Sequence, residues 1–252
     1  MITETILLAA AMGVAAGLMG SFVVMRRMAL AADALSHVAL PGIGIALALH
    51  IHPLIGAVAT LVFGALLVWA LEETTRTATE TIIGVVFSAA LAIGSMMTTG
   101  DDLIDALFGR RDAPDWTETL FASAAVTVVV GMIIRQRHRL VLALVSPDLA
   151  RTSGVNIRRL NLLYLQLFAL TIALGLRYLG VLLMGSMLII PAATAKRFSR
   201  NLTEMLVLSA VMAVAAILVG SIVADWLHRE PGPVIVSVAA LGFLISLWRR
   251  QS

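Results

Sequence analysis

The sequence contains no cysteine, which excludes both a disulfide framework and a metal site built on thiolates. Charge is also scarce: 13% of the 252 residues are charged, whereas 60% are hydrophobic. Soluble globular domains carry about 25% charged residues, so an ordinary soluble domain, a disordered chain and a fibrous protein are excluded. The single lysine, Lys196, follows no glycine-rich phosphate-binding loop. The chain is therefore not expected to hold ATP itself.

Long apolar runs make up most of the chain. A membrane-spanning helix needs roughly 20 mainly apolar residues, and we predict an all-α bundle with nine spans, at 5–25, 28–49, 54–71, 81–98, 117–134, 160–176, 178–195, 205–224 and 234–248. Eight spans are the alternative, because only Arg177, Tyr178 and Gly180 indicate a reversal between the sixth and seventh runs. No soluble domain or long linker is found, so residues 1–252 are expected to form one transmembrane domain.

The basic residues predict the orientation of this domain. With nine spans and the N-terminus outside, fourteen of the eighteen Lys and Arg residues fall on the inner side of the membrane, and Arg110, Arg111, Arg177 and Arg229 fall outside. The positive-inside rule expects this asymmetry. We therefore predict a multi-pass protein of the cell membrane with a cytoplasmic C-terminus. The arginines lie in short loops between apolar runs, which indicates a lipid surrounding and argues against a nucleic-acid partner.

The second apolar run is interrupted by polar residues, among them Asp33 and His37. Their spacing of four puts both side chains on one face of a helix. A carboxylate within a span is costly and usually faces a bundle interior or a water-filled path. In one interpretation, Asp33 caps the helix and His37 is a core histidine. In the other, the two side chains form half of a divalent-cation site, because such oxygen and nitrogen ligands suit zinc and manganese.

Two prolines indicate interruptions of spanning helices. Pro41 and Gly42 follow the Asp33–His37 pair, and Pro191 lies inside the seventh run. Discontinuous helices commonly border substrate sites in transporters, so these positions are candidates for gating. A simple kink is the alternative at both places.

Two histidines, His50 and His52, fall at the outer end of the second run. A pair with this spacing could help a metal to enter the protein. Two histidines in a short loop are also commonly no more than hydrated, and that interpretation stays open.

The inner segment 146–159 is polar and lies between two apolar runs. It predicts a short amphipathic helix that begins near Pro147 and ends near Gly154, with Leu149, Ala150 and Val155 as apolar contacts. Such a helix at the inner face is either a docking point for a cytosolic partner or an interfacial connector.

Several segments together resemble one known family. They are RRMALAADALSHVALPGIGIA (26–46), TETIIGVVFSAAL (79–91), DALFGR (105–110), PDLARTSGVNIRRLNLL (147–163), YLGVLLMGSMLIIPAATAKRF (178–198) and PGPVIVSVAALGFL (231–244). In this order they are similar to the zinc/manganese/iron ABC transporter permeases, the ABC-3 family. The second half is more distantly similar to the cobalamin and iron-siderophore permeases. One departure is Ala32, where the family usually has glycine.

The resemblance implies a homodimeric permease without a resident cofactor and without enzymatic activity of its own. Separate ATPase subunits would supply the energy, and an extracytoplasmic metal-binding protein would deliver zinc, manganese or iron. Asp33 and His37 match the family's path-lining metal ligands. The ATPase would dock on the segment that contains Pro147, Asp148, Leu149, Ala150, Arg151 and Gly154. Glu80 matches an acidic position whose role stays open.

Two other functions compete with the importer. A secondary metal/proton antiporter would use Asp33 as a titrating group and would need no ATPase. An intramembrane metalloenzyme would hold a catalytic ion on the same pair, but the chain has no H-E-x-x-H segment. The sequence does not select among the three metals.

Overall fold

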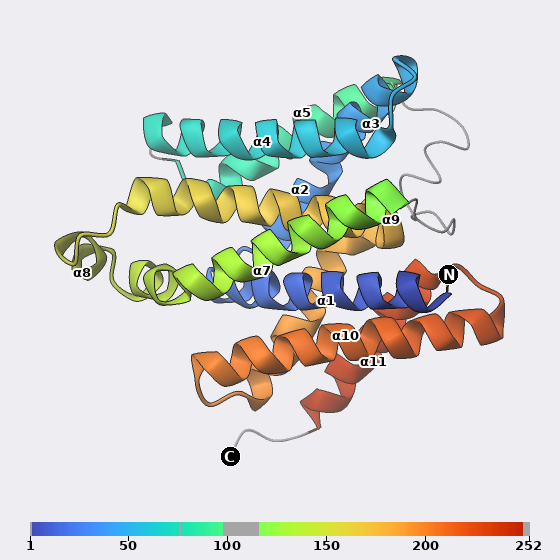
Figure 1. Cartoon of the computed structure of the whole chain (residues 1–252). Helices are drawn as coiled ribbons and strands as arrows, with labels where there is room; N and C mark the ends of the chain where they lie inside the picture. The colour runs from blue at the N-terminus through green and yellow to red at the C-terminus, as the bar shows by residue number, and fades with distance from the viewer. Residues whose placement is uncertain (1, 76, 98–115, 249–252) are drawn as a thin grey trace.

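The computed structural model describes residues 2–75, 77–97 and 116–248, and in this part of the chain every regular element is a helix (Figure 1). The prediction of an all-α bundle is confirmed. The segment 105–110 and the arginines at 76, 110, 111, 249 and 250 lie outside the described residues. The elements are α1 (Ile2–Met25), α2 (Ala29–Ser36), the 3-10 turn η1 (His37–Ala39), α3 (Leu40–Ala48), α4 (Pro53–Thr75), α5 (Thr79–Met97), α7 (Trp116–Val145), α8 (Pro147–Thr152), α9 (Ile157–Phe198), α10 (Leu202–Leu227) and α11 (Pro231–Leu247).

Eight described segments are long and apolar enough to cross a membrane. They are Leu8–Met25, Ala29–Ala48, Pro53–Thr75, Thr79–Met96, Thr119–Val145, Ile157–Leu176, Leu179–Phe198 and Leu202–Leu227. The shorter apolar helix α11 has 17 residues, which is about 26 Å of helix and lies at the lower limit for a span. The eight or nine predicted spans therefore correspond to these eight segments and α11.

The reversal between the sixth and seventh predicted spans lies at Gly180. Its torsion angles are φ 70° and ψ 174° inside the otherwise helical α9, a region of backbone space that is essentially restricted to glycine. Figure 1 shows the two halves of α9 running in different directions. The predicted interruption at Pro191 is wrong, because the helix continues through this residue to Phe198. Glycine at position 180, and not proline at position 191, interrupts the helix.

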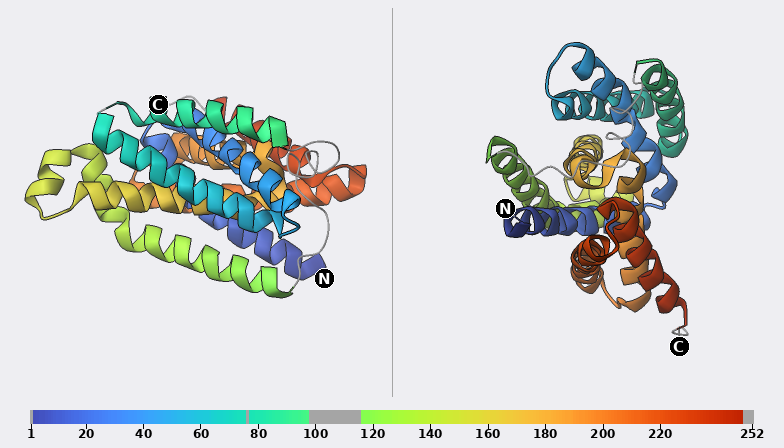
Figure 2. Two further views of the ribbon diagram at one scale, coloured as in Figure 1. Left: turned by 90° about the horizontal axis from the view of Figure 1, so that it is seen from above. Right: turned by 90° about the vertical axis from the view of Figure 1, so that its right-hand side faces the viewer.

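The centre of the bundle is α9, which packs against α1, α2, α4, α7, α10 and α11. Figure 2 shows α4 and α5 on one side of α9, with α10 and α11 on the other. Large side chains of α9 are completely buried there, among them Tyr164, Phe168 and Met187. The helix that follows the predicted docking segment is therefore the element against which most of the bundle is assembled.

A close approach between α1 and α10 depends on Gly17. A Cβ atom at this position would lie 2.5 Å from the backbone oxygen of Ser209 and 2.7 Å from the Cα of Ala210. The hydroxyl of Ser209 also donates a hydrogen bond to the backbone oxygen of Gly17, at 2.7 Å. Small residues permit such backbone contact between membrane helices.

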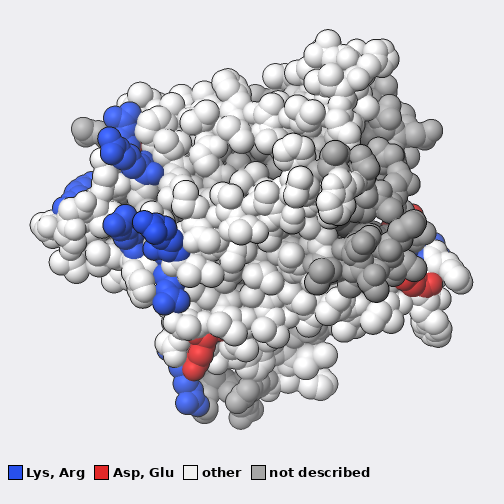
Figure 3. Space-filling model, in the orientation of Figure 1, with Lys and Arg blue, Asp and Glu red and all other residues white. Residues whose placement is uncertain are grey.

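The surface is that of a membrane protein. Large apolar side chains such as Phe63, Val85 and Ile222 are exposed along the helices. Trp69, Trp116, Trp226 and Trp248 lie within two turns of a helix end or directly after one, as expected for aromatic belts at the two interfaces. Figure 3 shows most of the visible Lys and Arg residues gathered at the end of the molecule where α8 lies.

Candidate functional site

The site is built on α2, which three residues separate from the end of α1. Asp33 is exposed, although its helical neighbours Ala32, Leu35 and Ser36 are buried. His37, the first residue of η1, is half-buried. Because Asp33 lies inside the candidate span Ala29–Ala48, the exposed face of α2 carries a carboxylate in a segment that is otherwise mainly apolar.

Behind this face, α2 rests on the second half of α9. A Cβ atom at Gly185 would lie 2.6 Å from the Cα of Asp33 and 2.8 Å from its Oδ1. The hydroxyl of Ser36 lies 2.7 Å from the backbone oxygen of Asp33 and 2.9 Å from that of Val181. Because Gly185 has no side chain, Asp33 can lie directly against α9, and the Ser36 hydroxyl holds it there.

His37 is placed between α2 and α5. Its ring lies 5.5 Å from the ring of Phe87, at an interplanar angle of 54°. Its Nδ1 is buried and has no hydrogen-bond partner among the described residues. No protein hydrogen bond to Nδ1 therefore selects one imidazole tautomer, and the ring is held by packing.

The pair falls short of a complete metal site within one chain. Nowhere in the described ranges do three His, Cys, Asp or Glu residues come together in a group that could hold a metal ion. Structural zinc sites use four ligands, and Asp33 and His37 supply at most half of that number. The exposed carboxylate of Asp33 stays accessible to groups from outside this chain.

The helix is interrupted at the pair itself, because the 3-10 turn η1 begins at His37. Pro41 lies in the first turn of α3, where a proline needs no hydrogen-bond donor. Gly42 contacts the backbone oxygen of Gly56 on α4, and a side chain at position 42 would collide with it. Pro41 and Gly42 therefore start α3 and allow it to pack on α4.

The other histidines of the second span lie far from the pair. His50 follows α3 at φ 54° and is exposed. Thirteen residues at 1.5 Å each put it about 20 Å along the helix from His37. The Nδ1 of His52 accepts a hydrogen bond from the backbone N–H of Leu54, at 3.3 Å, in the first turn of α4. The structure does not bring either histidine to the Asp33–His37 pair.

The predicted docking segment is a short helix, α8, at the basic end of the bundle. Ser146 caps it by accepting a hydrogen bond from the backbone N–H of Leu149. The side chain of Leu149 is 55% exposed, while Ala150 is buried. Asp148 and Arg151 form an exposed ion pair of 3.3 Å.

The chain leaves α8 through Gly154, at φ 77°, a conformation that favours glycine. The turn after α8 borders an open hollow of 470 Å³, which Glu73 of α4 also lines. Its lining residues are Glu73, Arg151, Gly154, Val155, Asn156, Ile157 and Arg158.

Sequence reasoning missed Gly185 as a neighbour of Asp33. The available signal was a glycine in the interior of an apolar run, since an isolated helical glycine commonly has a packing reason. The sequence gives no indication of which helix approaches it, so the contact with α2 emerges only from the fold.

The comparisons with known proteins agree with this architecture. The family model described as ABC 3 transport family matches residues 1–250. A high-affinity zinc uptake system membrane protein, ZnuB of Haemophilus influenzae, is 35% identical over 240 residues, covering 92% of this chain and 91% of the relative. A manganese transport system membrane protein, MntC of Halalkalibacterium halodurans, is 33% identical over 242 residues, covering 94% and 82%.

A solved structure supports the same assignment. The chain matches one from PsaBC of Streptococcus pneumoniae, determined in complex with Fab, with a TM-score of 0.85 and 27% identity. The match covers 97% of this chain and 90% of the other. Together with the family model, these matches show that the chain belongs to the ABC 3 transport family.

Proposed function

We propose that the chain is the membrane-spanning permease subunit of an ABC importer, which moves a divalent transition metal into the cytoplasm with energy from a separate ATPase. The observation that carries the proposal is the exposed Asp33 beside His37 inside a candidate span, in a chain of the ABC 3 transport family. In this reading the metal is cargo that binds the pair transiently.

The exposure of Asp33 supports a homodimer. A carboxylate that faced lipid would be costly, so within membranes such groups face a water-filled cavity or a protein partner. A two-fold axis beside α2 would bring a second Asp33–His37 pair to the first and would raise the number of ligands to four. Leu30, one turn before Asp33 on the same face, is 86% exposed and would line this contact.

Cysteine cross-linking tests the homodimer. The chain has no native cysteine, so Leu30→Cys introduces a single thiol and the unmodified chain is the control. In membranes treated with a short thiol-specific cross-linker, we expect a band of twice the monomer mass for Leu30→Cys alone. Cross-linked product at the level of the unmodified chain would contradict the proposed contact.

The ligand set leaves a choice among transition metals. One carboxylate oxygen and one imidazole nitrogen per chain are compatible with zinc, manganese and ferrous iron. The relatives named above are a zinc uptake protein and a manganese transport protein. We therefore propose zinc, manganese or iron as the class of cargo, delivered at the outer face by a metal-binding protein.

The basic end of the bundle is proposed as the cytoplasmic end. Lys and Arg gather around α8 (Figure 3), and such clusters lie on the cytoplasmic side of membrane proteins. The exposed Leu149 and the Asp148–Arg151 pair on α8 then face the cytosol. We propose this surface, from Pro147 to Gly154, as the docking point of the ATPase, with the N-terminus of the chain outside.

Metal accumulation in cells tests the proposal. A strain that lacks this gene is supplied with zinc, manganese or iron separately, and carries either the unmodified gene or the variants Asp33→Asn or His37→Gln. We expect both variants to reach the membrane in normal amounts and to lose accumulation, because each removes a ligand and keeps the side-chain volume. Asp225→Asn and His138→Gln, at exposed positions on α10 and α7, are the matched controls and should accumulate metal normally.

Two outcomes would overturn parts of the proposal. Normal accumulation by both ligand variants would remove the site assignment. Accumulation that persists in cells without the partner ATPase would favour the secondary antiporter over the importer.

A further inference from the structure

A chain of polar contacts joins four helices where α1 ends. The guanidinium of Arg26 donates a hydrogen bond to the Oδ1 of Asn161 on α9, at 2.8 Å. The Nδ2 of Asn161 donates in turn to the Oε2 of Glu72 on α4, at 2.6 Å. The other carboxylate oxygen of Glu72 accepts a hydrogen bond from the hydroxyl of Thr79 on α5, at 2.7 Å. Asn161 is thus the link between the end of α1 and the ends of α4 and α5.

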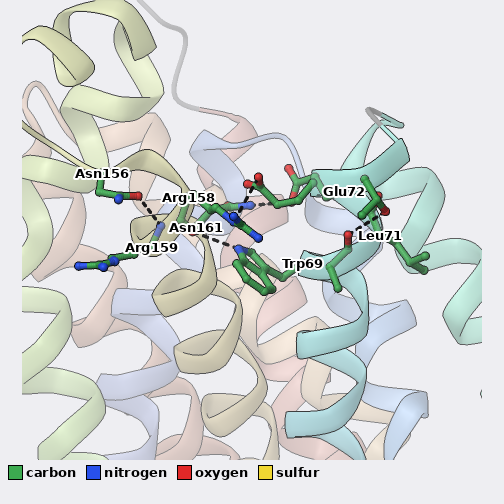
Figure 4. Close-up of polar contacts among 10 residues, drawn as sticks. Trp69, Leu71, Glu72, Asn156, Arg158, Arg159 and Asn161 are labelled. Carbon is green, nitrogen blue, oxygen red and sulfur yellow. Dashed lines mark hydrogen bonds and ion pairs between the residues drawn. The ribbon is translucent and has the colours of Figure 1, made fainter.

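Aromatic and ionic contacts surround this link. The guanidinium of Arg26 lies 3.8 Å from the centre of the fully buried Tyr164 ring. One turn before Asn161, Arg158 pairs with Glu73 at 3.4 Å and stacks on Trp69, whose indole N–H donates to the backbone oxygen of Arg158. Figure 4 shows Trp69 and Glu72 on one helix facing Arg158 and Asn161 on the other.

On one side, the link acts on α2 through a stiff turn. The N–H of Met28 donates to the backbone oxygen of Val23 and that of Arg27 to Val24, at 3.0 and 3.2 Å, and Arg27 has φ 60°. This is the Schellman arrangement that closes a helix end. The backbone oxygen of Met28 then accepts the N–H of Ala32 in the first turn of α2. Arg26 and α2 are therefore expected to move together, and the carboxylate of Asp33 moves with them.

On the other side, a series of hydrogen bonds connects Asn161 to α8 through the turn between α8 and α9. The N–H of Val155 donates to the backbone oxygen of Ala150 at 2.9 Å, and that of Gly154 to Arg151 at 3.1 Å. Asn156 then caps α9 by accepting from the backbone N–H of Arg159, at 3.0 Å. Asn161 follows in the second turn of this helix. A displacement of α8 is thus expected to reach Asn161 through a continuous series of hydrogen bonds.

We propose that Asn161 is a positioning residue that couples the ATPase-docking helix α8 to the Asp33–His37 pair, through Arg26 and the turn between α1 and α2. The inference rests on the proposed function, because it uses both the ATPase and the metal pathway. Asn161 touches neither of them. It transmits the movement of α8 to the Asp33–His37 pair because it holds the ends of α1, α4 and α9 together.

The test measures ATP hydrolysis and metal uptake in the same proteoliposomes, which contain the permease with its ATPase. The variant Asn161→Leu keeps the branched shape and the number of side-chain heavy atoms and removes both hydrogen bonds. We expect metal taken up per ATP hydrolysed to fall by about fivefold or more, the range of energetic coupling between sites, while hydrolysis and the melting temperature stay near those of the unmodified complex. Gln166→Leu is the matched control, because Gln166 lies five residues further along α9 and, within the described part of the chain, its side chain donates only to the backbone oxygen of Val62 on α4.

A second variant keeps the test decisive if Asn161→Leu does not assemble. Asn161→Asp still accepts from Arg26 but repels Glu72, so it should also lower uptake per ATP. An unchanged ratio in the variant that assembles would overturn the inference, as would a loss of uptake that only follows a loss of hydrolysis and thermal stability. Failure of the unmodified complex to move zinc, manganese or iron would instead refute the proposed function, and this outcome is separate from the comparison of variants.

Discussion

Gly185 offers a way to disturb the metal pair without removing a ligand. A Cβ atom there would lie 2.6 Å from the Cα of Asp33, whereas ordinary van der Waals contact begins at 3.4 Å. In Gly185→Ala, α2 must therefore retreat from α9 by about 0.8 Å, the difference between these distances. Overpacking of this kind costs about 1–3 kcal/mol, and a free-energy difference of that size corresponds to roughly 5–150-fold in an equilibrium. Because the strain acts on the residue that bears the carboxylate, we expect metal accumulation to decrease by a factor of roughly 5–150.

The assay compares Gly185→Ala with Gly84→Ala in metal accumulation and in thermal unfolding in detergent. Beyond its own stretch of helix, no atom of the described residues lies within 4 Å of a Cβ placed at Gly84 on α5. This control therefore keeps the gain of about 1 kcal/mol in helix propensity without a clash. We expect the control to accumulate metal normally and to unfold at the same or a higher temperature. Equal accumulation and equal melting temperatures for the two variants would refute the close contact between α2 and α9.

Three further predictions concern packing, docking and topology. Gly17→Ala should lower the stability of the α1–α10 contact by about 1–3 kcal/mol, measured by thermal unfolding. The control is Gly131→Ala, because no described atom outside its own stretch of helix lies within 4 Å of the new methyl group; equal melting temperatures would contradict the packing argument. Arg151→Glu reverses an exposed charge on α8 and should reduce co-purification of the ATPase, whereas an unchanged yield would argue against docking there. A reporter fused after Ser252 should be active in the cytoplasm, and an extracytoplasmic signal would require an even number of spans.

Local features of the sequence were sufficient to predict much of the fold. Apolar runs of membrane length located the spans, because a helix in lipid must satisfy its own backbone groups. The spacing of four between Asp33 and His37 predicted one shared helix face, whereas the structure has Asp33 on α2 and His37 at the start of the 3-10 turn η1. Small residues such as Gly17 of α1 are typical of close helix contacts, and the structure supplies the partner, α10.

Features that depend on two helices could not be predicted in this way. Pro191 was expected to interrupt the seventh run because proline lacks a backbone donor, but the surrounding helix continues through it. The break at Gly180, by contrast, is the reversal that the sequence did indicate. The contact between Gly185 and Asp33 joins residues 152 positions apart in the chain, and the link from Arg26 to Asn161 joins residues 135 positions apart. Neither position carries a local signal of its partner, since only the packing of α9 brings them together.

The incompleteness of the Asp33–His37 pair is consistent with a cargo site. Structural metal sites close four ligands around the ion and stabilise the fold, whereas an ion in transit must leave its ligands again. Here one chain supplies two ligands, one of them exposed, at the point where α2 gives way to a 3-10 turn. Under our proposal the remaining ligands come from a second copy, so affinity depends on how closely two copies of α2 approach each other. A movement of α2 that is transmitted through Asn161 would then change the affinity for the metal, although Asn161 does not contact the metal.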